Sequence, residues 1–153
     1  MSKRATHPDA QLILQLYDLR REAEMRKARN WWLKFNPQSA DDFLQIAMDF
    51  GSQENAWFRQ VMGYWSMAAS LVLSGAVNQD LFLDPSVSGE MFLIYAKTRP
   101  YLKEIRNKMK NPHIFANIEE LITSARKGRE TLKRMEAMIA ARRERMMAQG
   151  KTA

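Results

Sequence analysis

The chain has 153 residues, of which 46% are hydrophobic and 27% charged, a length and composition that fit one folded domain and exclude general disorder and the collagen-like and low-complexity classes. It contains no cysteine, which excludes disulfide bonds, thiolate metal sites and a cysteine nucleophile. Only 6 Gly and 5 Pro stand among many strong helix formers, so the composition predicts an all-α protein. Without cysteine or a visible export signal at the amino terminus, the expected location is the cytoplasm.

The first predicted helix is long. Thr6 supplies a hydroxyl N-cap and Pro8 lies in the first turn, two features that are typical of a helix start. Apolar residues then recur at helical spacing, with charges between them, until Pro37 prevents the helix from continuing. The pattern predicts a single amphipathic helix over residues 8–35. Ser39 opens a second, short helix that a glycine closes.

The third predicted helix, over residues 53–74, is apolar on several sides. Residues 61–79 include no charged side chain, and this run of 19 residues is long enough for a transmembrane helix to be considered. Small and polar residues interrupt the run, and Arg and Lys do not gather at its ends as they do beside membrane spans. We therefore predict a buried central helix of a bundle and no integral membrane segment.

Two further long helices complete the predicted fold. One covers residues 85–110, with a kink or break expected near Pro100, which removes a backbone hydrogen bond. The other runs from residue 112 to residue 149, because its apolar register continues across Gly128. These 38 residues would span about 57 Å as one helix, whereas a domain of this size is about 40 Å across. The fold class is therefore a single helical bundle with a buried central helix and a long projecting C-terminal helix.

The net charge of +7 is concentrated at the carboxyl end of the chain. Residues 1–125 contain 15 basic and 14 acidic side chains, whereas residues 126–153 contain 9 basic and 3 acidic ones. The predicted organisation is therefore a helical bundle domain over residues 1–125 and a basic helical extension over residues 126–153, continuous with the last bundle helix. Such an extension can attract nucleic acid or another anionic partner, although solvated basic helix faces are also common.

The middle of the chain resembles a known family. The resemblance is carried by residues 64–69 (YWSMAA), Val72, residues 75–82 (GAVNQDLF), residues 100–102 (PYL) and Arg106. Over about residues 55–110 these features resemble an uncharacterised bacterial helical family, a domain of unknown function. The resemblance implies an all-α fold and supplies no catalytic residues. Many members of that family carry a membrane-spanning helix ahead of this core, where this chain has a charged amphipathic helix.

No constellation of residues predicts catalysis, and no cofactor or metal is expected. His7 and His113 lack a second ligand at helical spacing, and the glycines are scattered singly, so phosphate-binding loops are absent. Adjacent carboxylates at residues 41–42 and 119–120 lie in the first turns of predicted helices, where acids complement the helix dipole. We therefore expect the protein not to be an enzyme.

The last helix supplies the candidate functional residues. One apolar face has the spacing of an assembly seam with another helix, and its members are Leu132, Met135, Ile139 and Met146. The candidate contacts to anions or nucleic acid are the arginines Arg134, Arg142, Arg143 and Arg145. The predicted function is a non-catalytic protein–protein interaction or self-assembly module, in its simplest form a homodimer through this seam. The alternative is nonspecific, electrostatic binding of nucleic acid by the arginines.

Overall fold

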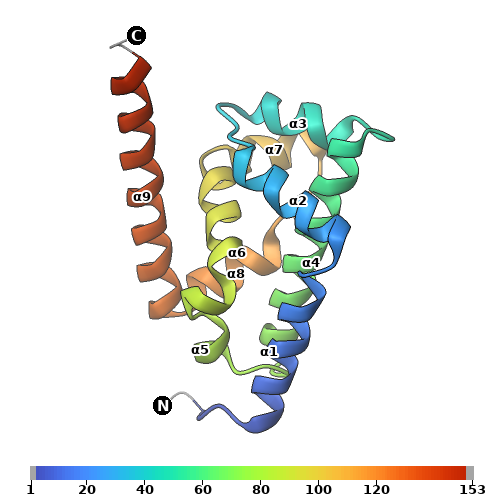
Figure 1. The fold of residues 1–153 in the computed structure, drawn as a ribbon, viewed down its shortest axis with the longest axis vertical. Helices are drawn as coiled ribbons and strands as arrows, with labels where there is room; N and C mark the ends of the chain where they lie inside the picture. The colour runs from blue at the N-terminus through green and yellow to red at the C-terminus, as the bar shows by residue number, and fades with distance from the viewer. Residues whose placement is uncertain (1–2, 151–153) are drawn as a thin grey trace.

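The computed structural model describes residues 3–150. Over these residues the chain forms nine α-helices, one short 3₁₀ helix and no strand, so the predicted all-α fold is confirmed (Figure 1). In chain order the elements are α1 (His7–Leu19), α2 (Ala23–Lys34), α3 (Ala40–Met48), α4 (Gln53–Leu73), α5 (Gln79–Phe82), α6 (Pro85–Thr98), η1 (Arg99–Tyr101), α7 (Leu102–Met109), α8 (Ala116–Ser124) and α9 (Arg126–Gly150).

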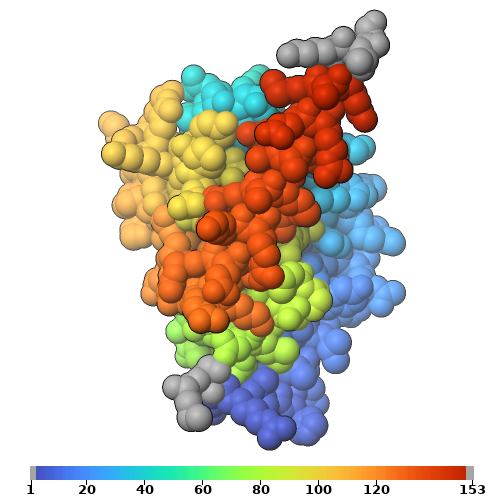
Figure 2. Space-filling model, turned by 90° about the vertical axis from the view of Figure 1, so that its left-hand side faces the viewer, coloured from blue at the N-terminus to red at the C-terminus, as the bar shows by residue number. Residues whose placement is uncertain are grey.

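α4 and α6 lie at the centre of the bundle. α4 packs against α2, α3 and α8, while α6 lies between α9 on one side and α4 with its neighbours on the other (Figure 1). α4 is central, as predicted, but it leaves a strip of residues exposed that includes Arg59, Gly63 and Met67. α6 is buried more deeply, with eight of its 14 residues in the core, among them Met91 and Tyr95. The reason is that α9 covers the side of α6 that would otherwise face solvent; Figure 2 shows α9 lying across this face.

The uncharged run at residues 61–79 belongs to the bundle. Val61 and Trp65 on α4 are fully buried, and the run continues through a turn into α5. Among the helices of residues 3–150, none combines the length and the apolarity that crossing a bilayer requires.

The prediction of one helix over residues 8–35 is wrong, because α1 and α2 are separated by residues 20–22. Glu22 is the N-cap of α2, and its carboxylate accepts hydrogen bonds from the backbone N–H groups of Glu24 and Met25 at 3.0 and 2.9 Å. These two hydrogen bonds lower the pKa of Glu22. Glutamate is a good helix former and is not among the preferred N-cap residues, so the sequence carried no clear signal for this break.

The break expected near Pro100 is confirmed. α6 ends at Thr98, η1 contains the proline, and α7 then continues to Met109. The hydroxyl of Thr98 donates to the carbonyl of Ile94 at 2.9 Å in the last turn of α6. The predicted helix over residues 85–110 is therefore two helices joined by a 3₁₀ turn, because proline cannot donate the backbone hydrogen bond that a continuous helix needs.

The prediction of one helix over residues 112–149 is wrong as well. α8 and α9 meet at Ala125, whose backbone is extended with ψ of 143°. Three residues later, a Cβ atom at Gly128 would lie 2.2 Å from the carbonyl oxygen of Ile122 on α8. The glycine therefore marks the place where the first turn of α9 crosses the end of α8 in close contact. From there α9 runs back along α6.

The first half of α9 is part of the bundle. The predicted boundary between residues 125 and 126 coincides with the break between α8 and α9, but Thr131 and Leu132 on α9 are buried in the same core as the other helices. The second half of α9 extends past this core, and most of its side chains from Ala140 to Gly150 are exposed. Residues 151–153 of the predicted extension lie outside the described residues.

Because α8 and α9 cross closely at Gly128, alanine substitutions at Gly63 and Gly128 should change the stability of the protein in opposite directions. Gly63→Ala on the exposed strip of α4 has open space around it, so it should stabilise the protein by about 1 kcal/mol through helix propensity. Gly128→Ala forces a methyl group against the backbone of Ile122 and should destabilise by about 1–3 kcal/mol. Urea unfolding followed by circular dichroism measures both changes. A stabilised Gly128→Ala variant would show that the two helices do not cross at this distance.

Candidate functional site

A buried lysine from α6 holds the end of α2. Lys97 is 7% exposed, and its Nζ donates hydrogen bonds to the backbone carbonyls of Trp32, Leu33 and Phe35 at 3.0, 3.0 and 2.9 Å. The last carbonyls of a helix have no partner within the helix, and a cation at this end also interacts favourably with the helix dipole. Lys97 therefore acts as the C-terminal cap of α2, from a position more than 60 residues further along the chain.

The surroundings of Lys97 are positive. Burial, together with the charges of Arg142 and Arg143 on α9, lowers the pKa of Lys97 from 10.5 to about 8. The carbonyl oxygens that surround the ammonium group carry only partial negative charge. The positive charge at this position is thus hydrogen-bonded, but no carboxylate neutralises it within the described part of the chain.

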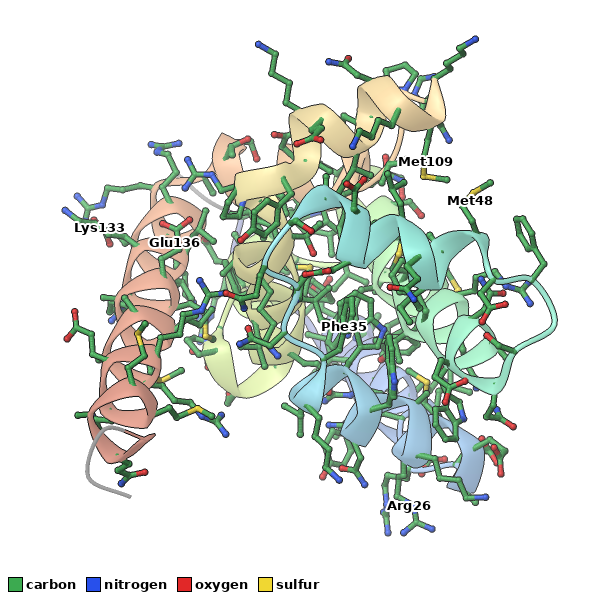
Figure 3. The ribbon with its side chains drawn as sticks, turned by 90° about the horizontal axis from the view of Figure 1, so that it is seen from above. Arg26, Phe35, Met48, Met109, Lys133 and Glu136 are labelled. Atoms are coloured by element: carbon green, nitrogen blue, oxygen red, sulfur yellow. The ribbon has the colours of Figure 1, made fainter. Side chains whose placement is uncertain are left out.

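A groove of about 460 Å³ lies over Lys97, between the second half of α9 and the end of α2. We call it the α9 groove. Its cations come from three helices, namely Lys34 on α2, Lys97 on α6, and Arg142 and Arg143 on α9. None of its lining residues is acidic. Seen from above, side chains of α9 extend into the space between this helix and the rest of the bundle (Figure 3).

The arginines of the α9 groove are only partly engaged by the protein itself. Nη2 of Arg143 donates to Oδ1 of Asn36 at 3.3 Å, while its Nε is buried with no hydrogen-bond partner among residues 3–150. The side chain of Arg142 forms neither a hydrogen bond nor an ion pair with the described residues. Both guanidinium groups therefore have donors left for an incoming acceptor.

The α9 groove also has an apolar side. Leu33 on α2 and Met146 on α9 are exposed, the latter to 62%, and Ile139 is half-buried beside them. Methionine is flexible and polarisable and adapts to different apolar partners. Cations and apolar side chains thus lie next to one another in a single groove.

The structure gathers two of the four predicted anion contacts into this groove. Arg142 and Arg143 line it, while Arg134 and Arg145 do not. Arg134 donates to the hydroxyl of Thr131 on its own helix at 3.4 Å, and Arg145 is exposed. Sequence reasoning missed Lys34 and Lys97. These lysines are distant in sequence from the arginines and come near them only because α9 packs on α6 while Lys97 of α6 binds the end of α2.

The predicted assembly seam contacts the protein's own core. Leu132 is 4% exposed, and Met135 and Ile139 are partly buried against the core, where α9 packs on α6. Of the four predicted seam residues, only Met146 is in the exposed class, at 62%. A second copy of the chain can reach Leu132 only if α9 leaves α6, so self-assembly through this face stays a prediction that requires a rearrangement.

The paired carboxylates link helices to one another. Glu119 accepts a hydrogen bond from Arg106 at 2.6 Å and one from the hydroxyl of Tyr95 at 3.2 Å, which connects α8 to α7 and α6. Asp41 forms an ion pair with Lys108 at 2.7 Å. Within residues 3–150 there is no group of three or more His, Cys, Asp or Glu side chains placed to hold a metal ion.

These features define an all-α bundle whose last helix encloses a basic groove with an apolar side. Residues 5–125 match a domain of unknown function, DUF4760, and the chain belongs to this family. The match is wider than the region of about residues 55–110 that carried the resemblance in the sequence, and it ends directly before α9. No curated protein and no solved structure matches the chain.

The lowered pKa of Lys97 predicts a pH dependence of stability. Between about pH 8 and 10.5 the unfolded chain keeps the Lys97 proton and the folded protein loses it, and stability rises with pH wherever the unfolded state binds more protons. The free energy of unfolding of the parent should therefore rise relative to that of Lys97→Met over this interval, and the two should run parallel below it. Urea unfolding as a function of pH measures the difference, with exposed Lys103→Met as the control. If the free energies of unfolding of the parent and of Lys97→Met changed in parallel over the whole pH range, the pKa of Lys97 would not be lowered.

The packing of α9 predicts different effects for two of its apolar residues. Leu132→Ala removes a side chain from the core and should destabilise the protein by about 2–5 kcal/mol. Met138, which is 59% exposed, should tolerate alanine within about 0.5 kcal/mol. Thermal unfolding and light scattering should be measured together. If Leu132→Ala reduced the solution mass and left the melting temperature unchanged, Leu132 would lie at an interface between copies.

Proposed function

We propose that this protein is a non-catalytic protein–protein interaction module that binds an acidic, amphipathic segment of a partner protein in the α9 groove. The observation that carries the proposal is the convergence of four cations from three helices on one groove whose lining contains no acidic residue. Like charges held together cost free energy, which a bound anion offsets.

The charges of the groove suit carboxylates. The guanidinium groups of Arg142 and Arg143 present planar arrays of N–H donors, and arginine binds carboxylates in a bidentate manner. Lys97 lies beneath them, and these arginines contribute to its lowered pKa. A carboxylate in the groove would favour the charged form of Lys97, so binding near pH 8 to 9 should be coupled to proton uptake.

The apolar side of the groove favours a partner segment that is amphipathic. Leu33, Ile139 and Met146 lie beside the cations, and recognition of a helix in a groove depends on apolar residues at positions i, i+3, i+4 and i+7. A helical segment with apolar side chains on one face and Asp or Glu next to them would contact both parts of the groove. Its negative charge would also be attracted by the net charge of +7 of this chain.

A partner of opposite charge is favoured over a second copy of this chain. Within residues 126–150, 8 side chains are basic and 3 acidic, so pairing two α9 helices would bring like charges together. Self-assembly, the simplest form of the interaction that the sequence predicts, thus has an electrostatic cost as well as the cost of moving α9 off α6.

Nucleic acid is the second candidate ligand. Its phosphates would be attracted by the same cations, and the affinity would then fall steeply with salt. However, Lys97 lies deep in the groove, and none of the lining residues is an aromatic on which a base would stack. The exposed apolar residues of the groove also have no role in phosphate binding, so the groove suits an acidic peptide better.

A matched pair of charge reversals tests the proposal. The probe is a labelled peptide of about 14 residues, or four helical turns, with Leu on one face and Glu on the other. Arg142→Glu with Arg143→Glu should weaken its binding by about tenfold or more, because both groove arginines are lost. Arg134→Glu with Arg145→Glu changes the net charge by the same amount outside the groove and should leave most of the affinity. Fluorescence anisotropy gives both affinities.

Three results would argue against the proposal. Equal weakening by the two double variants would show that net charge, and not the groove, attracts the peptide. Binding of duplex DNA by the parent, together with no binding of the peptide, would favour the nucleic-acid function. A parent that forms a dimer and loses peptide binding on dimerisation would show that the groove is used between copies of this chain.

A further inference from the structure

A second cavity lies between α1, α4, α5 and the start of α6, and it shares no lining residue with the α9 groove. Its volume is about 250 Å³. Most of its wall is apolar, with Ile13 and Leu16 from α1, Phe82 from α5 and Val87 from α6. We call it the α1 pocket. It is a little smaller than the cavities of about 300–1,000 Å³ that hold drug-sized ligands.

A buried arginine lines the α1 pocket. Arg20, which directly follows α1, is 7% exposed. Its guanidinium carbon lies 5.1 Å from the centre of the Tyr17 ring and 5.3 Å from the centre of the Trp65 ring, so the cation contacts two aromatic rings. Its Nε is buried and has no hydrogen-bond partner within residues 3–150, and no carboxylate of these residues forms an ion pair with Arg20.

The carboxylate that is bound to Trp65 is already engaged by a second cation. Glu90 on α6 accepts a hydrogen bond from Nε of Arg29 at 2.7 Å and one from Nε1 of Trp65 at 2.9 Å. Arg29 and Glu90 neutralise each other, which leaves the charge of Arg20 uncompensated. Aromatic faces attract a cation, but they accept no strong hydrogen bond from its N–H donors. A buried guanidinium group without a counter-ion or a hydrogen-bond acceptor costs free energy, and a bound anion would remove this cost.

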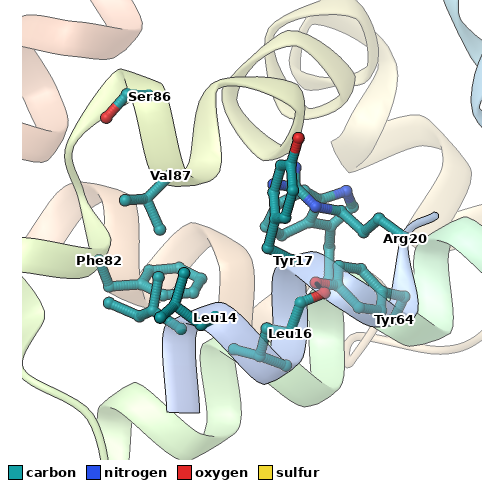
Figure 4. Close-up of a pocket in the computed structure, with 10 residues that line it drawn as sticks. Leu14, Leu16, Tyr17, Arg20, Tyr64, Phe82, Ser86 and Val87 are labelled. Atoms are coloured by element: carbon teal, nitrogen blue, oxygen red, sulfur yellow. Dashed lines mark hydrogen bonds between the residues drawn. The ribbon is translucent and has the colours of Figure 1, made fainter. Parts of the chain in front are cut away.

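The α1 pocket has a charged end and an apolar end. In the close-up, Tyr17 and Arg20 lie on one side of the pocket, whereas Leu14, Phe82 and Val87 lie on the other (Figure 4). Tyr64 forms part of the wall near Arg20, but its hydroxyl donates to the carbonyl of Leu16 at 2.6 Å and is not available to a ligand as a donor. The hydroxyls of Tyr17 and Ser86 also line the pocket, and that of Ser86 donates to Asp84 at 2.6 Å. The guanidinium group of Arg20 is the one charged group of this lining, so it would orient an anionic ligand.

We infer that the α1 pocket binds a small amphipathic carboxylate, such as a free fatty acid of about six to ten carbons. The carboxylate would accept hydrogen bonds from Arg20 and neutralise it, and the alkyl chain would extend over Leu16 toward Phe82 and Val87. One negative charge fits, because buried Arg20 lies beside the half-buried pair of Arg29 and Glu90, and these three side chains together carry one positive charge in excess. This inference does not rest on the function proposed for the α9 groove.

Calorimetric titration with octanoate tests the inference, using adjacent arginines as a matched pair. The parent should bind octanoate and bind octanol, which has no charge, at least about tenfold more weakly. Arg20→Met should lose that preference, since it keeps much of the apolar stem and removes the guanidinium group. Arg21→Met, at an exposed position one residue further on, should bind octanoate within about twofold of the parent. Circular dichroism checks that each variant is folded.

A second pair keeps the test decisive if Arg20→Met fails to fold. Leu14 is 67% exposed and lines the apolar end of the pocket, so Leu14→Glu should fold and should repel the carboxylate or expose the alkyl chain to a charge. Gln15→Glu adds the same charge on an exposed side of α1 and should leave octanoate binding unchanged. No octanoate binding by the parent at millimolar concentration, equal affinity for octanol, or equal affinity of the Leu14→Glu and Gln15→Glu variants would each overturn the inference.

Discussion

The structure depends on two charged side chains through which α6 holds its neighbours, half-buried Glu90 and buried Lys97. Glu90 pairs with Arg29 on α2 and also accepts a hydrogen bond from Trp65 on α4. Two turns further along, Lys97 binds the last carbonyls of α2. Because removing one partner of a buried polar contact costs far more than the contact contributes, these two attachments fix where α2 lies and how it ends. α9 then has to cover α6, since α6 is apolar on the side that faces away from α2 and α4.

Both candidate ligand sites follow from this arrangement. The end of α2 at Lys97 brings Lys34 and Leu33 to the arginines of α9, which creates the α9 groove. The beginning of α2, capped by Glu22, makes the chain turn after α1 so that Arg20 lies over Trp65. In each site a buried cation is held by groups other than carboxylates, by backbone carbonyls at Lys97 and by aromatic rings at Arg20. Each site is therefore left with positive charge that an external anion can neutralise.

The sequence predicted the helix boundaries that are set by residues close to them in the chain, such as capping residues and proline. Ser39, which the sequence predicts as a helix start, accepts the hydrogen bond of an N-cap from the N–H of Asp42. Pro100 interrupts its helix however the rest of the chain is packed, because the lack of a backbone N–H is a property of proline itself. The breaks at Glu22 and Ala125 gave no such signal: glutamate also favours a helix interior, and Ala125 is extended only because α9 turns back to pack on α6.

The sequence by itself determined that the chain is all-α, that residues 61–79 lie in a bundle and that the basic residues gather near the carboxyl end, since composition, capping residues and hydrophobic spacing are properties of short segments. It also indicated Arg142 and Arg143 as anion contacts from their local density of charge. Only the tertiary structure decided that Leu132 packs within its own chain and that Lys97 and Arg20 are buried cations. The contacts of Lys97 with α2 join residues 62 to 65 positions apart; such pairs form when helices pack, and no pattern within a single helix records which distant helix its side chains will meet.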